Sequence, residues 1–213
     1  MLNKQNKGFS LLELLIVIAI MGIVGVAVFT GGGVTKKAKK IESDFRNFTD
    51  YLNLHKNRTL ASGNASFVQV VSNNNNGDIT TTVTPYSFND QVFGTQNTCD
   101  FCCNNYTEIT NQKKFTTTTS EIKMCVGGTN CLAAMNTSGI CFYADGSSRM
   151  TKGTSFLMQT KWDTDDGESG DAFQVKVHSA TSFFEKLKCI VELNLESDTY
   201  CAPGTEGHWQ TLK

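Results

Sequence analysis

The chain has 213 residues, 39% of them hydrophobic and 18% charged, which suffices for one folded domain with an appendage and is too short for two full cores. Its formal net charge of -1 provides no basic field, which argues against nucleic acid as a partner. All 8 cysteines lie between Cys99 and Cys201, an even number in one region, which indicates pairing in an oxidising compartment and argues against a cytosolic protein.

The first element is an apolar run that follows a short basic segment. Residues 1–8 carry Lys4 and Lys7, and residues 9–29 contain a single charge, at Glu13. At about 1.5 Å per residue, a helix over this run reaches roughly 32 Å, enough to cross a bilayer. A carboxylate within such a helix costs on the order of 3 kcal/mol, so Glu13 needs a compensating partner. The pattern predicts a transmembrane helix over residues 9–29.

The residues around the start of this run resemble a known processing site. Lys7-Gly8-Phe9-Ser10-Leu11-Leu12-Glu13 is similar to the cleavage motif of type IV prepilins and pseudopilins. In that family a membrane peptidase cuts after the glycine and methylates the new terminal residue. The resemblance implies a leader peptide at 1–8, cleavage between Gly8 and Phe9, N-methylation of Phe9, and an assembly role for Glu13. That carboxylate would neutralise the terminal amine of a neighbouring subunit and set the axial register.

Two simpler interpretations of the same segment remain open. An ordinary secretory signal peptide would also have a basic start and an apolar core, with a small-residue exit near residues 25–27. The run is long for a signal core, however, and carries an acid near its start. A plain membrane anchor is the other alternative, and it leaves Glu13 unexplained.

A second helical segment is expected over residues 30–63. Many members of the family have a proline where this chain has Thr30, and here glycines follow at 31–33, which predict local bending or melting. Beyond them, side chains recur at spacings of three and four, typical of a helix face packed on a core. This stripe consists of Ile41, Phe45, Phe48, Leu52 and His55. We interpret His55 as a packed histidine rather than a ligand, and Gly63 as the end of the helix.

Four lysines lie just beyond the apolar run, at Lys36, Lys37, Lys39 and Lys40. We expect them to touch phospholipid headgroups. They outnumber the two lysines of residues 1–8, so a count of charges alone would place the N-terminus on the side of the membrane away from the cytoplasm. The processing motif places it on the cytoplasmic side, and we follow the motif because it is the more specific signal.

Residues 64–213 are expected to form a β-rich head. Strand candidates occur at 65–71, 80–84, 114–118, 139–143, 155–159, 172–177 and 188–193. Turn sequences rich in Asn, Asp and Gly separate them at 73–78, 144–147 and 165–167, which favours antiparallel hairpins. The predicted fold is therefore α+β: a long N-terminal helix, with a transmembrane half and an amphipathic half, packed on an antiparallel β-sheet head in the type IV pilin-like manner.

Two stretches add a second, narrower resemblance. Residues 50–63 are similar to the end of the helix in GspH/FimT-like minor pseudopilins, although His55 and Lys56 stand where that family favours alanine and arginine. Residues 140–147 are similar to its later F-x-x-D-G turn, here at Phe142, Asp145 and Gly146. Another minor pseudopilin and a pilus-tip minor pilin are the alternatives.

The cysteines are candidates for disulfide bonds: Cys99, Cys102, Cys103, Cys125, Cys131, Cys141, Cys189 and Cys201. We expect Cys189 to pair with Cys201, closing a loop of about a dozen residues, and the resemblance points the same way because pilins commonly staple that end. The connectivity of the other six stays open. Zinc held by Cys99-x-x-Cys102-Cys103 together with Cys125, Cys131 and Cys141 is the less favoured alternative.

The head contains one candidate for a metal ion and no catalytic motif. Five acids in nine residues form a weak calcium candidate, Asp163, Asp165, Asp166, Glu168 and Asp171, for which a solvated acidic turn is the favoured alternative. No other cofactor is expected. The histidines His55, His178 and His208 are far apart in the sequence and accompany no nucleophile motif, so we do not expect an enzyme.

The resemblance implies a structural subunit, a minor pseudopilin or minor pilin of a type II secretion pseudopilus or a type IV pilus. Its partners would be other pilins or pseudopilins, the prepilin peptidase and the inner-membrane assembly platform. The subunit would sit in the inner membrane with its head in the periplasm, or on the cell surface within a filament. The alternatives are a pilus-tip module that binds DNA or a surface ligand, and a secreted disulfide-rich protein with an ordinary signal peptide.

Overall fold

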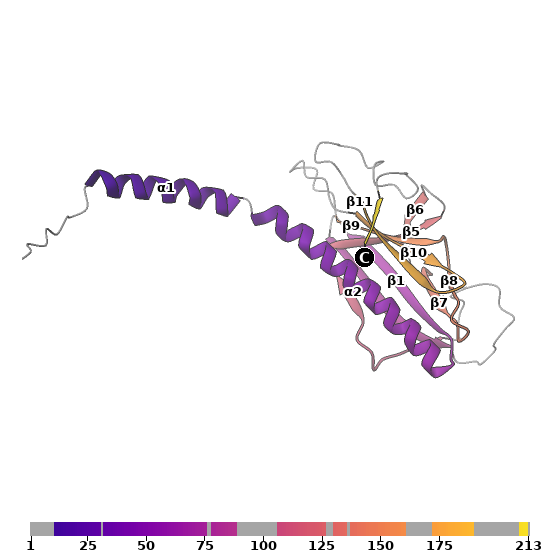
Figure 1. Ribbon diagram of the computed structural model, residues 1–213. Helices are drawn as coiled ribbons and strands as arrows, with labels where there is room; N and C mark the ends of the chain where they lie inside the picture. The colour runs from indigo at the N-terminus through magenta and orange to yellow at the C-terminus, as the bar shows by residue number, and fades with distance from the viewer. Residues whose placement is uncertain are drawn as a thin grey trace, which may run out of the picture. The chain divides into compact units, whose positions relative to one another are not determined.

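A computed structural model of the protein describes residues 11–30, 32–75, 78–88, 106–126, 130–135, 137–160, 172–189 and 209–212 (Figure 1). The chain divides into two compact units, residues 1–39 and residues 40–213. The first unit contains helix α1, Leu11–Thr30, and the start of helix α2, Gly32–Ser62. The second contains the rest of α2 and the β-strands, which we call the body. The α+β fold class predicted from the sequence is confirmed.

The ends of the two helices lie near glycines. Helix α1 ends at Thr30 and α2 begins at Gly32, so Gly32 and Gly33 are helical and not melted, whereas Gly31 lies outside the described residues. At its other end, α2 stops at Ser62 because Gly63 adopts a positive φ of 69°. The Gly63 N–H donates to the Thr59 carbonyl at 3.0 Å, which satisfies one of the last carbonyls of the helix.

The body contains two antiparallel sheets. The first has the order β3-β2-β1-β7-β8, with β4 also paired to β2. Its strands are β1 Ser66–Asn75, β2 Asp78–Phe88, β3 Tyr106–Glu108, β4 Phe115–Thr117, β7 Gly139–Phe142 and β8 Ser148–Met150. The second has the order β12-β11-β10-β9-β5-β6. Its strands are β5 Ser120–Val126, β6 Asn130–Ala133, β9 Ser155–Thr160, β10 Ala172–His178, β11 Phe183–Cys189 and β12 Trp209–Thr211.

Helix α2 contributes to the core through the stripe that the sequence predicts. Ile41, Phe45, Phe48, Leu52 and His55 are all buried. Phe45 stacks on Phe173 of β10, with ring centroids 4.9 Å apart, and Phe48 meets Phe156 of β9 edge-on at 5.4 Å. Phe48 also lies 6.0 Å from Phe115 of β4. The helix therefore packs against both sheets, as its position in front of β1 suggests (Figure 1).

Six of the seven strand candidates correspond to observed strands and the seventh is misplaced at its start, whereas five observed strands were not predicted: β3, β5, β6, β8 and β12. The candidate at 188–193 is wrong in its start, because β11 begins at Phe183. Ser182 precedes the strand with a positive φ of 48°, a conformation that is uncommon for serine and that the sequence therefore does not indicate. Strand β5 was not predicted, although Ile122 and Met124 alternate with charged residues in the pattern of a half-buried strand.

Candidate assembly segment and the junction of the two sheets

Helix α1 contains the candidate assembly residue Glu13, and its apolar side chains from Leu11 to Met21 are exposed. The exposed fraction is 80% for Leu11 and 68% for Met21, and the apolar side chains between them are exposed as well. Glu13 lies in the first turn, where its carboxylate interacts favourably with the positive end of the helix dipole. Gly8 and Phe9, the predicted processing residues, lie outside the described residues. In the part of the chain that is described, no helix is both long and apolar enough to cross a membrane.

His55 is a packed histidine in the structure. Its side chain is 1% exposed, and its ring lies 4.5 Å from that of Tyr51 between centroids. Burial, reinforced by the nearby Arg58 guanidinium, lowers the pKa of His55 from 6.5 to about 4. Burial also raises the pKa of Tyr51 to about 12. Both groups are therefore neutral at physiological pH. His178 is exposed on β10 beside Glu185, at 3.5 Å, and His208 lies outside the described residues.

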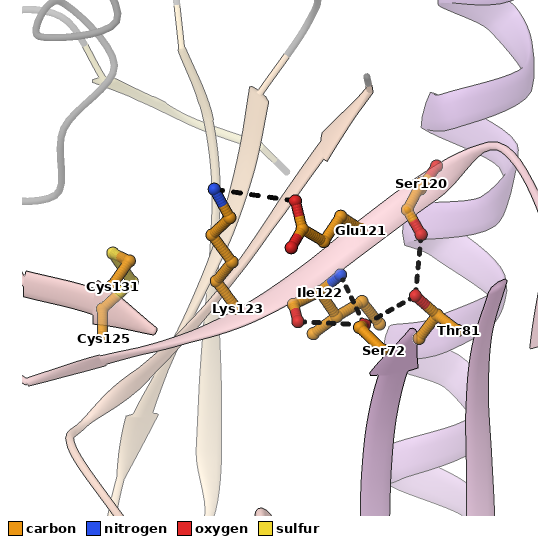
Figure 2. Close-up of polar contacts among 8 residues, drawn as sticks. All are labelled: Ser72, Thr81, Ser120, Glu121, Ile122, Lys123, Cys125 and Cys131. Carbon is orange, nitrogen blue, oxygen red and sulfur yellow. Dashed lines mark hydrogen bonds and ion pairs between the residues drawn. A yellow bond between two sulfur atoms is a disulfide. The ribbon is translucent and has the colours of Figure 1, made fainter. Parts of the chain in front are cut away.

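The two sheets are joined by side-chain hydroxyls where β1 and β2 meet β5 (Figure 2). Ser72 Oγ lies 2.7 Å from Thr81 Oγ1 and accepts the Ile122 N–H at 3.1 Å. Thr81 donates to the Ser120 carbonyl at 2.8 Å. Strand β6 pairs with β5 only from Lys123 onward, so these hydroxyls satisfy the part of the β5 edge that no strand covers. We call Ser72, Thr81, Ser120 and Ile122 the hydroxyl junction.

Beyond the junction, a disulfide holds the edge of the second sheet. Cys125 of β5 and Cys131 of β6 face each other in the strand register and are bonded (Figure 2). The chain after β6 then returns to the first sheet, where the Ala134 carbonyl accepts the Ser72 N–H at 2.8 Å. The disulfide therefore closes the hairpin from which the connection between the two sheets departs.

Other predicted sites are only partly described. Cys189 is disulfide-bonded, and so are three of the zinc candidates, Cys125, Cys131 and Cys141, which are therefore not available as zinc ligands. The expected partner Cys201 lies outside the described residues, and so do Cys99, Cys102 and Cys103. The five calcium candidates, Asp163, Asp165, Asp166, Glu168 and Asp171, also lie outside them. Within the described ranges, no group of three or more His, Cys, Asp or Glu residues could hold a metal ion.

Two lysines of the body, Lys114 and Lys188, make contacts within it. Lys114 forms an ion pair with Glu108 at 2.8 Å, and this hydrogen bond raises the pKa of Lys114. The Lys188 ammonium lies over the ring of Phe173, 5.5 Å from its centroid. These contacts make Lys114 and Lys188 part of the body's own packing.

Two polar contacts between α2 and the body were not predicted from the sequence. The Asp44 carboxylate accepts hydrogen bonds from Thr117 at 2.6 Å and Thr119 at 2.7 Å. The Lys56 ammonium donates to the carbonyls of Thr181 at 3.1 Å and Ser182 at 2.9 Å. Each joins residues more than 70 positions apart in the chain, so no local pattern could have indicated them.

Comparison with known proteins identifies the N-terminal segment. Residues 3–29 match the family model described as the prokaryotic N-terminal methylation motif. The matched range contains Gly8, Phe9 and Glu13, the three residues for which the sequence predicts processing and assembly. No curated protein and no solved structure matches the chain.

Proposed function

We propose that this chain, which is type IV pilin-like by its N-terminal methylation motif, is a minor pseudopilin or minor pilin, a structural subunit and not an enzyme. The motif supports processing by a prepilin peptidase and assembly with other pilin-type subunits. The finer assignment, to a type II secretion pseudopilus or a type IV pilus, rests on the combination of this motif with a helix-and-sheet body.

The proposed mechanism begins with cleavage between Gly8 and Phe9. The apolar helix then anchors the subunit in the inner membrane, with the body in the periplasm, until the assembly platform moves it into a filament. There, the helices of several subunits cover one another. Fully covering a large apolar side chain stabilises the assembly by about 1.5–3 kcal/mol.

Glu13 sets the register in this mechanism. Once Phe9 is the terminal residue, its amine stays cationic when methylated and lies at the edge of an apolar bundle. An unpaired charge there costs several kcal/mol, so a subunit slides until its neighbour's carboxylate meets the amine. The observation that carries the proposal is the presence of one acid, within the matched motif, on a helix whose apolar side chains from Leu11 to Met21 are exposed.

The test compares, in cells, two substitutions that each remove one glutamate. We expect Glu13→Ala to lower incorporation into filaments by more than about tenfold, because tenfold corresponds to only about 1.4 kcal/mol. Glu42→Ala is the matched control, since Glu42 is a partly exposed acid of α2 that pairs with Arg46. Normal incorporation of the Glu13 variant would contradict the mechanism.

Processing is tested separately by mass spectrometry of the mature N-terminus. We expect a chain that starts at a methylated Phe9. A chain that keeps residues 1–8, or one that starts near Val28 after signal-peptide cleavage, would rule out the proposal. The location of the wild-type chain, in a short periplasmic filament or in a surface pilus, would decide between the two machines.

A further inference from the structure

Strand β6 is the last strand of the second sheet, and its outer edge is open in the part of the chain that the structure describes. The sheet order places β5 on one side of β6 and no described strand on the other (Figure 1). An open edge presents backbone N–H and C=O groups with which another strand can pair. The edge strands β3 and β8 contain a charged residue each, Glu108 and Arg149, which opposes such pairing. Strand β6 contains none, and neither does the sequence around it from residue 124 to residue 144.

The register of β6 on β5 determines which backbone groups of β6 face the open edge. Residues that oppose one another in an antiparallel ladder alternate between a pair that exchanges two hydrogen bonds and a pair that exchanges none. The Ala134 N–H donates to the Ile122 carbonyl at 3.3 Å, so these two residues form a bonded pair. The next pair along the strands, Lys123 with Ala133, is therefore an unbonded pair.

The same alternation makes the two bonded cysteines an unbonded pair of the ladder. Cys125 opposes Cys131, two positions beyond the pair that contains Ala133. Their Cα atoms lie 4.0 Å apart, closer to the about 4.5 Å of an unbonded pair than to the about 5.5 Å of a bonded one. The N–H and C=O groups of Cys131 and Ala133 therefore point away from β5. Among the hydrogen bonds between described residues, none uses these outward groups.

This edge is complementary to a second copy of itself in antiparallel orientation. With Leu132 on a twofold axis, Cys131 of each copy opposes Ala133 of the other, and each of these two pairs exchanges two hydrogen bonds. The outward backbone groups of both residues are then satisfied. Leu132 opposes Leu132 of the other copy in an unbonded pair, where side chains approach most closely. Because Leu132 is 58% exposed in the single chain, pairing also removes apolar surface from water.

The disulfide prepares the edge for such pairing. It lies on the face of the sheet opposite to Leu132, because successive side chains of a strand point to opposite faces. The hairpin of β5 and β6 is thereby closed covalently, so it loses less conformational freedom when another strand is added. Val126 of β5, which is 50% exposed, lies on the same face as Leu132 and extends the apolar surface beside it.

We propose that the β6 edge is an interface between two copies of this chain, which pair their β6 strands antiparallel about Leu132 and so join their second sheets. The inference goes beyond the proposed function and does not depend on the processing of residues 1–8. The absence of charge on the edge means that two copies do not repel one another there. The paired segment is short, so we expect a weak dimer.

The first test measures the association state of the full-length chain by sedimentation velocity, in detergent with a large excess of micelles over protein. We expect a dimer at a chain concentration of about 100 μM. Ala133→Pro removes two of the four backbone hydrogen bonds between the copies while keeping those to β5, and should weaken the dimer at least about tenfold. A wild-type chain that is monomeric under these conditions would overturn the inference.

The matched control for the proline is Thr211→Pro in the edge strand β12. The Leu212 N–H donates to the Lys186 carbonyl, so by the same alternation the Thr211 N–H points away from β11. Strand β12 is also uncharged, but it has no exposed large apolar side chain. This variant should dimerise as the wild type does. A dimer that Ala133→Pro leaves unchanged would reflect association through another surface, such as helix α1, and would overturn the inference.

The second test uses the twofold axis and does not depend on a proline. Leu132→Lys and Leu132→Glu each place two like charges opposite one another, so each variant alone should be monomeric. A mixture of the two should form a heterodimer, because lysine then opposes glutamate, and about 1 M salt should weaken it. Copurification of differently tagged chains measures the heterodimer.

The matched control for the charge exchange is the pair Phe183→Lys and Phe183→Glu. Phe183 of β11 is 59% exposed, nearly the same as Leu132, but it does not lie on the β6 edge. Each of these variants should dimerise alone as the wild type does. If the two Leu132 variants fail to associate when mixed, or if each dimerises alone as strongly as the wild type, the inference is overturned.

Discussion

Helix α1 and the part of α2 that belongs to the body both carry large apolar side chains, but these side chains are exposed in α1 and buried in α2. In α1 the apolar side chains from Leu11 to Met21 surround the helix and are exposed, 80% in the case of Leu11. In α2 they form one stripe, and Phe48 at its centre is 0% exposed. A helix with one apolar stripe needs one partner, which the chain's own sheets provide. A helix that is apolar all round needs partners on every side, which one chain cannot provide.

The largest expected effect breaks this comparison directly. Phe48→Ala should destabilise the body by about 3–5 kcal/mol, because it opens a cavity between α2, Phe156 and Phe115. Leu15→Ala on α1 is the matched change, and it should leave the unfolding of the body unaltered within about 0.5 kcal/mol. Denaturant unfolding of the full chain in detergent measures both. Equal effects would mean that the two helices are not distinct in the way described.

The second effect is a loss of stability of the body at acidic pH. The unfolded chain binds a proton on His55 below about pH 6.5, whereas the folded chain does so only below about pH 4. The folded state therefore loses stability as the pH falls between these values, by about 2 kcal/mol from pH 7.5 to pH 5. His55→Phe should remove that part of the pH dependence in denaturant titrations. His178→Phe, at an exposed position, is the control, and an equal change there would contradict the role of burial.

The third effect concerns the disulfide between β5 and β6, which stabilises the body by a covalent bond and not by the packing of the helix stripe. The double variant Cys125→Ser/Cys131→Ser avoids a free thiol and should lower stability by about 2 kcal/mol, the entropy of closing so short a loop. Thermal unfolding without reductant measures it. If the double variant unfolds at the wild-type temperature, the disulfide does not hold the hairpin as the fold implies.

The smallest effect tests the hydroxyl junction. Ser72→Ala leaves the Ile122 N–H without its partner and should cost about 1–2 kcal/mol. The control is Ser87→Ala, because Ser87 Oγ makes only one long, exposed bond of 3.4 Å to the Thr107 carbonyl. The denaturant midpoint of Ser72→Ala should be lower than that of Ser87→Ala. A midpoint of Ser72→Ala equal to that of the wild type would mean that water replaces the Ser72 hydroxyl.

The helix and the first hairpins were predictable because they rest on local signals. The stripe from Ile41 to His55 follows the helical period, and Gly63 supplies the left-handed conformation at the end of α2. Asn75 pairs with Asp78, as the Asn-Gly sequence between them predicts. The start of β11 was not predictable in this way. Ser182 turns the chain there, and its hydroxyl donates to the Gly146 carbonyl, 36 residues earlier.

The sequence by itself determined the N-terminal motif, the division into an all-round apolar helix and a striped one, and the α+β class. Each of these depends on the chemistry and spacing of neighbouring residues. Only the tertiary structure decided that Asp44 receives two threonine hydroxyls, that Ser72 covers the edge of β5, and which sheet each strand joins. These contacts connect residues 50 to 75 positions apart, and the hydrogen bonds form only after packing has brought the strands together.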